Sequence, residues 1–196
     1  MTTTTTMPIL PVEQNEAERA VATLTMAFSA DPILRWVFPD SREFLEGYPQ
    51  LVRAFGANAL QSGTVERTPA FEGVALWLAP ASGPDEALLG ALIESFPDER
   101  KEELLGFLGK MEQFHIQEPH WYLPFIGVDP ARQGSGHGSA LLAHATARCD
   151  RDGLPAYLEA SSPRNKPLYE RHGFVEAGVI QYGSSPAMWS MVRKPR

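Results

Sequence analysis

The stretch RQGSGHGSALL, residues 132–142, places three glycines at alternate positions directly before apolar residues with helical spacing. Each glycine costs a helix about 1 kcal/mol relative to alanine, so three of them indicate a tight turn. The apolar stretch WYLPFIGV, residues 121–128, precedes the turn and is typical of a strand. A helix that begins at such a turn leaves its first backbone N–H groups open to an anion. The alternative is a turn that needs glycine only for positive φ angles.

The spacing of the glycines distinguishes between phosphate-binding loops. A dinucleotide-binding loop has G-x-G-x-x-G near the first strand, whereas Ser139 stands at the third glycine position counted from Gly134, and this loop comes late in the chain. The Gly-Lys-Ser/Thr of a Walker A loop is absent. The sequence instead contains Gln133-x-x-Gly136-x-Gly138 directly after a strand that ends in GVDP.

That pattern resembles the pyrophosphate-binding loop of the GNAT superfamily of N-acetyltransferases, which bind acetyl-CoA. A second stretch, LEASSPRNKPLYERHGF at residues 158–174, reproduces the superfamily signature N-x-x-x-Y-x-x-x-G-F with Asn165, Tyr169, Gly173 and Phe174. Within the superfamily, the C-terminal half is similar to the puromycin N-acetyltransferases. The N-terminal half, which shapes the acceptor pocket, is similar only in AFSADP and VALWLAP.

The resemblance implies transfer of an acetyl group from acetyl-CoA to a primary amine, by direct attack of the amine on the thioester. It implies that backbone groups of Ile126, Gly127 and Val128 pair with the pantetheine arm, that Asn165 contacts the cofactor, and that Tyr169 is the general acid. A helix cap at Asn165 and a packing role for Tyr169 are the structural alternatives. The N–H groups of the loop would hold the pyrophosphate; these belong to Gln133, Gly134, Ser135, Gly136, His137, Gly138 and Ser139. His137 could add a donor or face solvent.

The base that takes the proton of the amine is defined less well by the sequence. Many relatives carry a carboxylate on the strand before the glycine loop, but WYLPFIGV has none. Glu159, on the following strand, is our first candidate, and strand alternation places it on one face with Tyr157. Glu118, His120, a water chain or a backbone carbonyl are the alternatives. A structural ion pair or a substrate contact would be the non-catalytic role of Glu159.

The candidate residues for the acceptor pocket are Phe28, Asp31, Trp36 and Trp121. The aromatic ones could equally belong to the core. Asp31 stands at the end of a predicted helix before Pro32, where its carboxylate could meet a cationic amine or stabilise a turn.

The chain is expected to have an α+β (mixed α/β) fold, in which one domain over residues 8–196 contains a central mixed, mostly antiparallel sheet flanked by helices. Residues 1–7 are expected to form a disordered tail, residues 33–40 an aromatic-rich turn, and residues 84–118 a helical insertion between two central strands. Helices are predicted at 13–30, 42–61, 84–92, 97–113, 136–151 and 166–171, and strands at 9–12, 65–67, 73–78, 121–128, 156–160, 175–182 and 187–192.

Charge and composition argue against several classes of partner. A net charge of −7 disfavours nucleic acid, and no apolar run approaches the roughly 20 residues of a membrane span. The first residues lack the features of a secretory signal. The five histidines show no metal-ligand spacing, so no metal is expected. The expected partner is a small-molecule amine, and exposed final strands would allow a homodimer.

The single cysteine, Cys149, fits a reducing, cytoplasmic location. It stands in an apolar, helix-patterned stretch with no base beside it, so we expect a core thiol and no nucleophile. Two other functions stay open at this point. One is a protein or peptide N-acetyltransferase, and the other is a non-catalytic acyl-CoA sensor.

Overall fold

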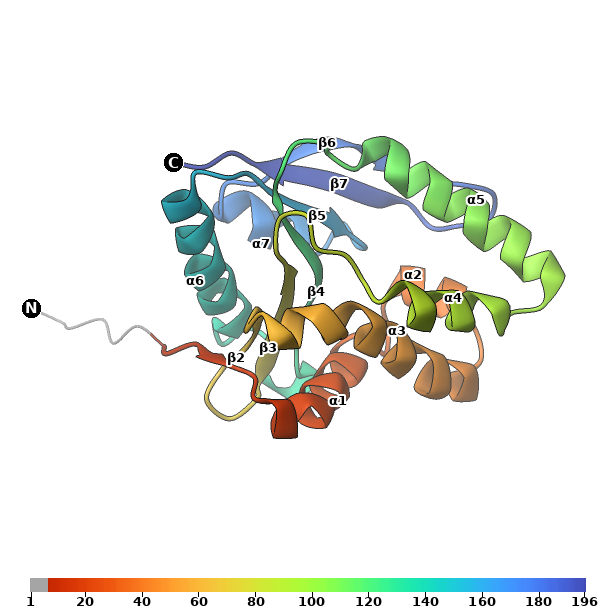
Figure 1. Ribbon diagram of the computed structural model, residues 1–196, viewed down its shortest axis with the longest axis horizontal. Helices are drawn as coiled ribbons and strands as arrows, with labels where there is room; N and C mark the ends of the chain where they lie inside the picture. The colour runs from red at the N-terminus through yellow and green to blue at the C-terminus, as the bar shows by residue number, and fades with distance from the viewer. Residues whose placement is uncertain (1–6) are drawn as a thin grey trace, which may run out of the picture.

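Seven strands form one sheet in the computed structural model, which describes residues 7–196 (Figure 1). The strands are β1 (Leu10–Pro11), β2 (Val65–Arg67), β3 (Gly73–Leu78), β4 (Trp121–Val128), β5 (Ala156–Ala160), β6 (Val175–Ile180) and β7 (Met188–Arg193). The helices are α1 (Ala17–Ala27), α2 (Pro32–Val37), α3 (Ser41–Gln61), α4 (Glu86–Glu94), α5 (Asp98–Phe114), α6 (His137–Asp152) and α7 (Lys166–Arg171). Two short 3-10 helices lie at Gln14–Glu16 and Pro130–Arg132. Apart from Met7, the expected tail of residues 1–7 lies outside the described residues.

The strands follow one another in the order β1-β2-β3-β4-β5-β7-β6. β4 and β5 are parallel, and every other neighbouring pair is antiparallel. The sheet is therefore mixed and mostly antiparallel, as the sequence predicts. The edge strand at the C-terminal end is β6, because β7 lies between β5 and β6.

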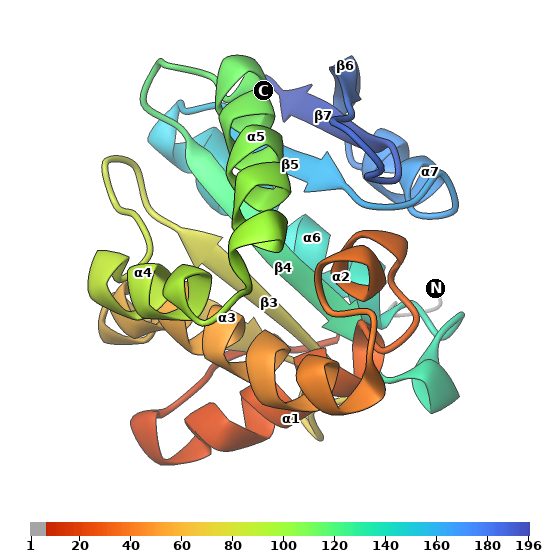
Figure 2. The same cartoon turned by 90° about the vertical axis from the view of Figure 1, so that its right-hand side faces the viewer.

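Helices cover both faces of the sheet, with α1, α3 and α4 on one face and α6 on the other (Figure 2). Strand alternation divides β3 between the two layers. Leu76 of β3 packs with Leu24 and Tyr48 on the α1 and α3 side. Trp77 packs with Leu141 on the α6 side. All six residues of β3 are buried, as the run GVALWL predicts.

The helices α4 and α5 lie in the chain between β3 and β4, which are neighbours in the sheet. α5 reaches across β6, where the ring of Phe114 lies against Gly178. A Cβ at Gly178 would stand 2.3 Å from that ring, and a Cβ at Gly106 of α5 would stand 2.3 Å from the ring of Tyr182. The two glycines therefore allow α5 to approach this end of the sheet closely.

The prediction of a turn over residues 33–40 is wrong for its first part, because α2 occupies Pro32–Val37. Proline suits the first helical position, where its missing N–H has no partner in any case. Asp31 provides the cap, and one of its carboxylate oxygens accepts from the N–H groups of Ile33 at 3.0 Å and Leu34 at 3.1 Å.

No helix among residues 7–196 is both long enough and apolar enough to cross a bilayer.

Candidate active site

The centre of the sheet contains a fork between β4 and β5. The two strands pair only through Trp121, Tyr122 and Leu123 of β4, and their pairing ends where Pro124 follows. Proline has no N–H to donate to a ladder. Residues 124–128 therefore have β3 on one side and, among residues 7–196, no strand on the other. This free edge includes Ile126, Gly127 and Val128, and it can pair with an extended ligand in the manner of an added strand.

The glycine loop follows β4 and ends at the N-terminus of α6. Gly134 has φ +79° and Gly136, which is the N-cap, has φ +87°. These are left-handed conformations that favour glycine. A Cβ at either position would meet no protein atom within 4 Å, so the loop needs these glycines for their backbone angles. Gly138 has an ordinary φ, and its Cβ would stand 3.4 Å from Leu168 of α7.

The loop exposes a row of free donors. Among the described residues, no backbone N–H from 133 to 139 donates to a protein acceptor. The N-terminal end of α6 adds its positive dipole. The side chain of Ser139 lies 2.7 Å from Nε2 of His172, which ties the first turn of α6 to the end of α7. His137 is half-buried, and its Nδ1 makes no hydrogen bond. These donors and the dipole suit a phosphate group.

The helix α7 places Tyr169 beside this loop. This residue is 7% exposed, and its ring packs near Phe174, with ring centroids 6.2 Å apart. Burial raises the pKa of the Tyr169 phenol well above its usual value, and the charge of Asp31 adds to the effect. The hydroxyl is therefore protonated at neutral pH. Asn165 occupies the N-cap position of α7 without a side-chain cap hydrogen bond, so its amide is free to contact a ligand.

Glu159 lies on β5 at the fork. Its side chain is 5% exposed, and its Oε1 is buried with no hydrogen-bond partner in the part of the chain that the structure describes. Burial raises the pKa values of Tyr122 and Tyr157 well above their usual range, and the charge of Glu159 and the closeness of its carboxylate to both hydroxyls add to this effect. Neither hydroxyl forms a hydrogen bond with Oε1 in the described part of the chain. Nδ1 of His115 lies 3.9 Å from Oε1, too far for a direct hydrogen bond. The structure thus buries a carboxylate oxygen with a free acceptor position.

Tyr169, Asn165 and Glu159 meet at one cavity of about 200 Å³. Ile126 on the free edge of β4 also lines it. The rest of the lining is almost entirely apolar and comes mostly from α2, α3, α4, α5, β4 and the segments that join them. It includes Val37, Phe38, Leu51, Phe55, Leu92, Phe96, Phe107, Met111 and Phe125.

Two acceptor-pocket candidates, Phe28 and Asp31, line this cavity. Both oxygens of Asp31 are already occupied, one by the amides of α2 and the other by the hydroxyl of Ser161. Asp31 therefore holds the start of α2 against the end of β5. Burial raises the pKa of its carboxyl, and its three hydrogen bonds counteract that shift.

The other two candidates, Trp36 and Trp121, do not line the cavity. The indole N–H of Trp36 donates to Ser184 at 3.0 Å, and its ring packs on Phe107. The indole N–H of Trp121 donates to Asp152 at 2.9 Å on the α6 face. Both are packing residues, and strand alternation turns Trp121 away from the acceptor side.

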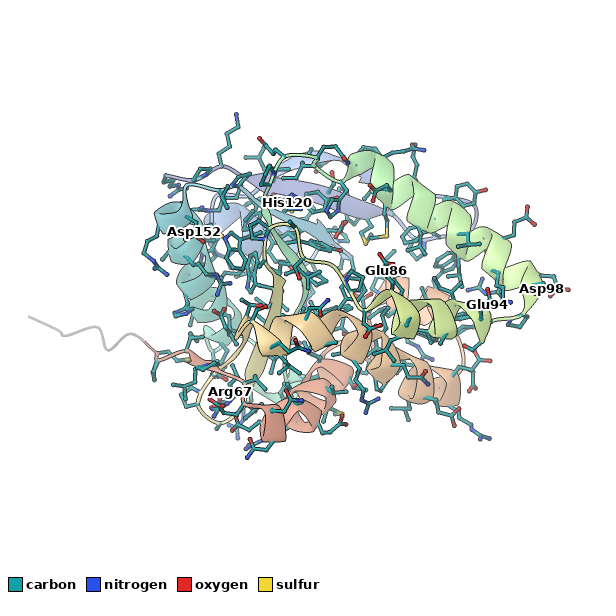
Figure 3. All side chains as sticks on the ribbon, in the orientation of Figure 1. Arg67, Glu86, Glu94, Asp98, His120 and Asp152 are labelled. Carbon is teal, nitrogen blue, oxygen red and sulfur yellow. The ribbon has the colours of Figure 1, made fainter. Side chains whose placement is uncertain are left out.

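The remaining titratable candidates are also placed by the structure. Cys149 is buried in α6, and burial raises the pKa of its thiol to about 11, so it is a core thiol. Glu118 and His120 lie just before β4 and line a second cavity, which Glu159 does not line. Figure 3 labels His120, which lies far from Glu94 and Asp98 at the junction of α4 and α5.

Sequence reasoning missed most of the apolar lining and the position of His115 near Glu159. The lining residues are far apart in the sequence, and only the packing of four helices brings them together. One signal was available, since the sequence ALLGALIESF, residues 87–96, carries more apolar residues than one buried face of a helix requires.

Comparison with known proteins gives matches across the chain. The family model described as "Acetyltransferase (GNAT) family" matches residues 63–174, which include the glycine loop and Tyr169. An uncharacterized N-acetyltransferase of Schizosaccharomyces pombe is 30% identical over 179 residues, which cover 84% of this chain and 72% of that protein. A mycothiol acetyltransferase of Streptomyces avermitilis is 35% identical over 82 residues, or 40% of this chain and 26% of that protein.

Solved structures show the same fold. A Corynebacterium glutamicum structure, described as histone acetyltransferase HPA2 and related acetyltransferase, has a TM-score of 0.71 at 27% identity and covers 97% of both chains. Arylalkylamine N-acetyltransferase 2 of Aedes aegypti also has a TM-score of 0.71, with 97% of this chain and 99% of that chain covered. Its identity of 13% supports a shared fold alone.

Proposed function

The chain belongs to the GNAT family of acetyltransferases, and from this premise we propose that it moves an acetyl group from acetyl-CoA to the primary amine of a small molecule with an apolar group. One observation carries the proposal. The buried, unpartnered Oε1 of Glu159 and the protonated side chain of Tyr169 line the same apolar cavity at the fork between β4 and β5. A proton acceptor and a proton donor are thus available at one place.

The residues around the fork fit acetyl-CoA. The free N–H groups of residues 133–139 would hold its pyrophosphate, and the open space beside Gly134 and Gly136 leaves room for it. The free edge of β4 at Ile126, Gly127 and Val128 would pair with the pantetheine arm. Bound acetyl-CoA supplies an activated acetyl thioester.

The residues of this chain then position the amine, accept one proton from it and donate another to the leaving group. The neutral amine attacks the carbonyl carbon, so that a C–N bond forms while the C–S bond breaks. Glu159 takes one proton from the amine nitrogen, and Tyr169 gives its phenolic proton to the departing sulfur. The acid and base later return to their starting states by exchange with solvent. No enzyme nucleophile is needed, which agrees with the buried, protonated state of Cys149.

The shape and chemistry of the cavity favour an acceptor with an apolar group. An apolar protein cavity of about 150 Å³ can bind benzene, so the cavity of about 200 Å³ has room for one aromatic ring. Asp31 and Glu159 are the carboxylates in its lining. An amine next to an aromatic ring, as in the aminoacyl-nucleoside puromycin, is the first acceptor to test, and a role in antibiotic resistance would follow from it.

One observation argues against each of the two alternative functions, the peptide acetyltransferase and the acyl-CoA sensor. A peptide acceptor needs an open groove, whereas α4 and α5 contribute Leu92 and Phe107 to the cavity lining and the segment between them contributes Phe96. A non-catalytic sensor gives no reason to bury a carboxylate oxygen without a partner, because such burial destabilises the fold.

The experiment measures release of CoA thiol from acetyl-CoA with three acceptors, namely puromycin, 2-phenylethylamine and ethanolamine, and with a control without amine. We expect amine-dependent release and a kcat/KM for 2-phenylethylamine about tenfold or more above that for ethanolamine. Burial of one aromatic side chain contributes roughly 1.5–3 kcal/mol, which corresponds to more than a tenfold difference. Release with peptides alone would support the peptide alternative. Binding of acetyl-CoA without release for any amine or peptide would support the sensor.

A further inference from the structure

A second cavity, of about 290 Å³, lies next to the fork and is lined by polar groups that the reaction above does not use. His115, from the end of α5, and His120, from the segment before β4, both line it. Tyr122 lines both this cavity and the apolar one. The two histidines thus stand between Glu159 and a separate space at the surface.

The distances connect these groups in a row. Nδ1 of His115 lies 3.9 Å from Oε1 of Glu159, a span that a small shift of the ring can shorten to a hydrogen bond. Nε2 of His115 lies 3.0 Å from Nε2 of His120. Nδ1 of His120 lies 2.7 Å from the backbone oxygen of Glu118. Both rings are half-buried, and their centroids are 4.8 Å apart.

These contacts determine where the protons lie. The carbonyl oxygen of Glu118 can only accept, so Nδ1 of His120 carries a hydrogen. In the neutral ring, Nε2 of His120 is then an acceptor, and the hydrogen between the two rings belongs to Nε2 of His115. The neutral His115 therefore presents the bare Nδ1 to Glu159. This is the arrangement in which His115 can take a proton from a protonated Glu159.

We propose that His115 and His120 form a relay that carries the proton of the acceptor amine from Glu159 to water in the second cavity. The proposal rests on the proposed function, because it concerns the proton that the amine loses.

Each transfer of the relay balances. The Glu159 carboxyl gives its proton to Nδ1 of His115 and becomes a carboxylate again. The resulting imidazolium releases its Nε2 hydrogen to Nε2 of His120, and His115 is left neutral with the proton on Nδ1. His120, now an imidazolium, releases its Nδ1 proton to water and is left neutral with the proton on Nε2. Proton exchange with water then returns both rings to their starting tautomers.

The surroundings favour the neutral state of His120 in the relay. Burial lowers the pKa of His120, and the neighbouring His115 lowers it further, whereas the Glu118 carbonyl and the charges of Glu159 and Glu118 act in the opposite direction. Tyr122 and Tyr157 also face the pair, and their ring centroids lie 5.0 and 4.6 Å from that of His115. Glu112 of α5 is a further titratable group nearby, and its charge acts on Tyr157. Both tyrosines stay protonated, because burial raises their pKa values. A neutral histidine can accept a proton, as the relay requires.

The test compares three variants of the full chain, His115→Gln, His120→Ala and His144→Ala, in weakly buffered solution. His144 is the matched control, since it is a half-exposed histidine of α6 near Glu66, outside both cavities. We expect kcat to fall about tenfold in the first two variants and to stay unchanged in the third. Added imidazole should restore most of the activity of His120→Ala, because the second cavity can admit it. A purely structural role would not give such rescue.

Unchanged kcat in both relay variants, or loss without rescue by imidazole, would overturn the relay. A wild-type chain that is inactive with every amine would count against the proposed function instead. In that case the imidazole ¹⁵N spectrum of the wild-type chain decides on the relay. The relay requires the Nε2–H form of His115 and the Nδ1–H form of His120, and the opposite tautomers would refute it.

Discussion

Replacement of Gly136 with alanine tests how much the glycine loop depends on a left-handed backbone conformation at this position. Gly136 is the N-cap of α6 and has φ +87°. A side chain in this left-handed region costs about 1–2 kcal/mol. The smaller entropy of the unfolded chain offsets about 0.4–1 kcal/mol of that cost. A Cβ would meet no protein atom within 4 Å, so no clash adds to the cost. We therefore expect Gly136→Ala to lower the free energy of unfolding by about 1 kcal/mol.

Gly138→Ala is the matched control two residues further on. Its φ is ordinary, and its Cβ would make normal contacts, 3.4 Å from Leu168 and 3.7 Å from Val128. Alanine is the better helix former by up to about 1 kcal/mol. Gly138→Ala should therefore be as stable as the wild type or more stable.

Urea unfolding and titration with acetyl-CoA measure both variants. For a chain of this length, a loss of about 1 kcal/mol lowers the melting temperature by roughly 2–4 °C. The Cβ of Gly136→Ala would enter the space that we assign to the pyrophosphate, and affinity for acetyl-CoA should fall roughly tenfold, which is 1.4 kcal/mol. The Cβ of Gly138→Ala points toward protein, so affinity should stay within about twofold. If Gly136→Ala is as stable and binds as tightly as the wild type, the account of the loop is refuted.

Three further predictions concern residues elsewhere in the fold. Tyr169→Phe should lower kcat about 100-fold, as loss of a general acid does, while calorimetry should show an unchanged Kd for acetyl-CoA; weaker binding with unchanged kcat would contradict the role as acid. The Arg193 guanidinium holds the pKa of Asp150 at about 2, below its ordinary 3.8, so the pair stabilises the fold above pH 3.8 and loses this effect as pH falls toward about 2. Urea unfolding at several pH values should show Asp150→Asn less stable than the wild type above pH 3.8, with the difference closing in that window; a constant difference would refute the assignment. Cys149, with its pKa raised to about 11, should resist iodoacetamide at neutral pH in the native chain and react after unfolding, as mass spectrometry can show; rapid labelling of the native chain would contradict its burial.

Local patterns of the sequence predict much of the cofactor side. The strands β4 and β5 and the helix α7 have the predicted bounds, because buried apolar runs and the Lys166–Arg171 segment between turn residues are local signals. The glycine loop also lies where the sequence places it. Gly134 and Gly136 have the positive φ angles that one interpretation of the sequence expects, and Gly138 makes a packing contact; binding of an anion at the loop stays a prediction.

The acceptor side was predicted less well, because it depends on contacts between distant segments. Pro32 suggests that a helix ends before it and a turn follows. It is instead the first residue of α2, because Asp31 caps the N-terminus of this helix. Trp36 and Trp121 are aromatic residues near the site in sequence, yet their indole N–H groups found partners elsewhere. Pro124 is a local signal for the end of the pairing between β4 and β5, but the burial of Glu159 beside His115 depends on segments that are distant in the sequence.

The most direct test of the central claim compares two carboxylates in the same cavity. Formation of the N-acetylated amine from acetyl-CoA should be followed for the wild type, Glu159→Gln and Asp31→Asn, with the best acceptor. We expect product from the wild type, a rate about 100-fold lower for Glu159→Gln, and a much smaller decrease for Asp31→Asn, whose remaining side-chain oxygen can still cap α2. Equal rates for Glu159→Gln and the wild type would contradict the claim that Glu159 takes the proton of the amine.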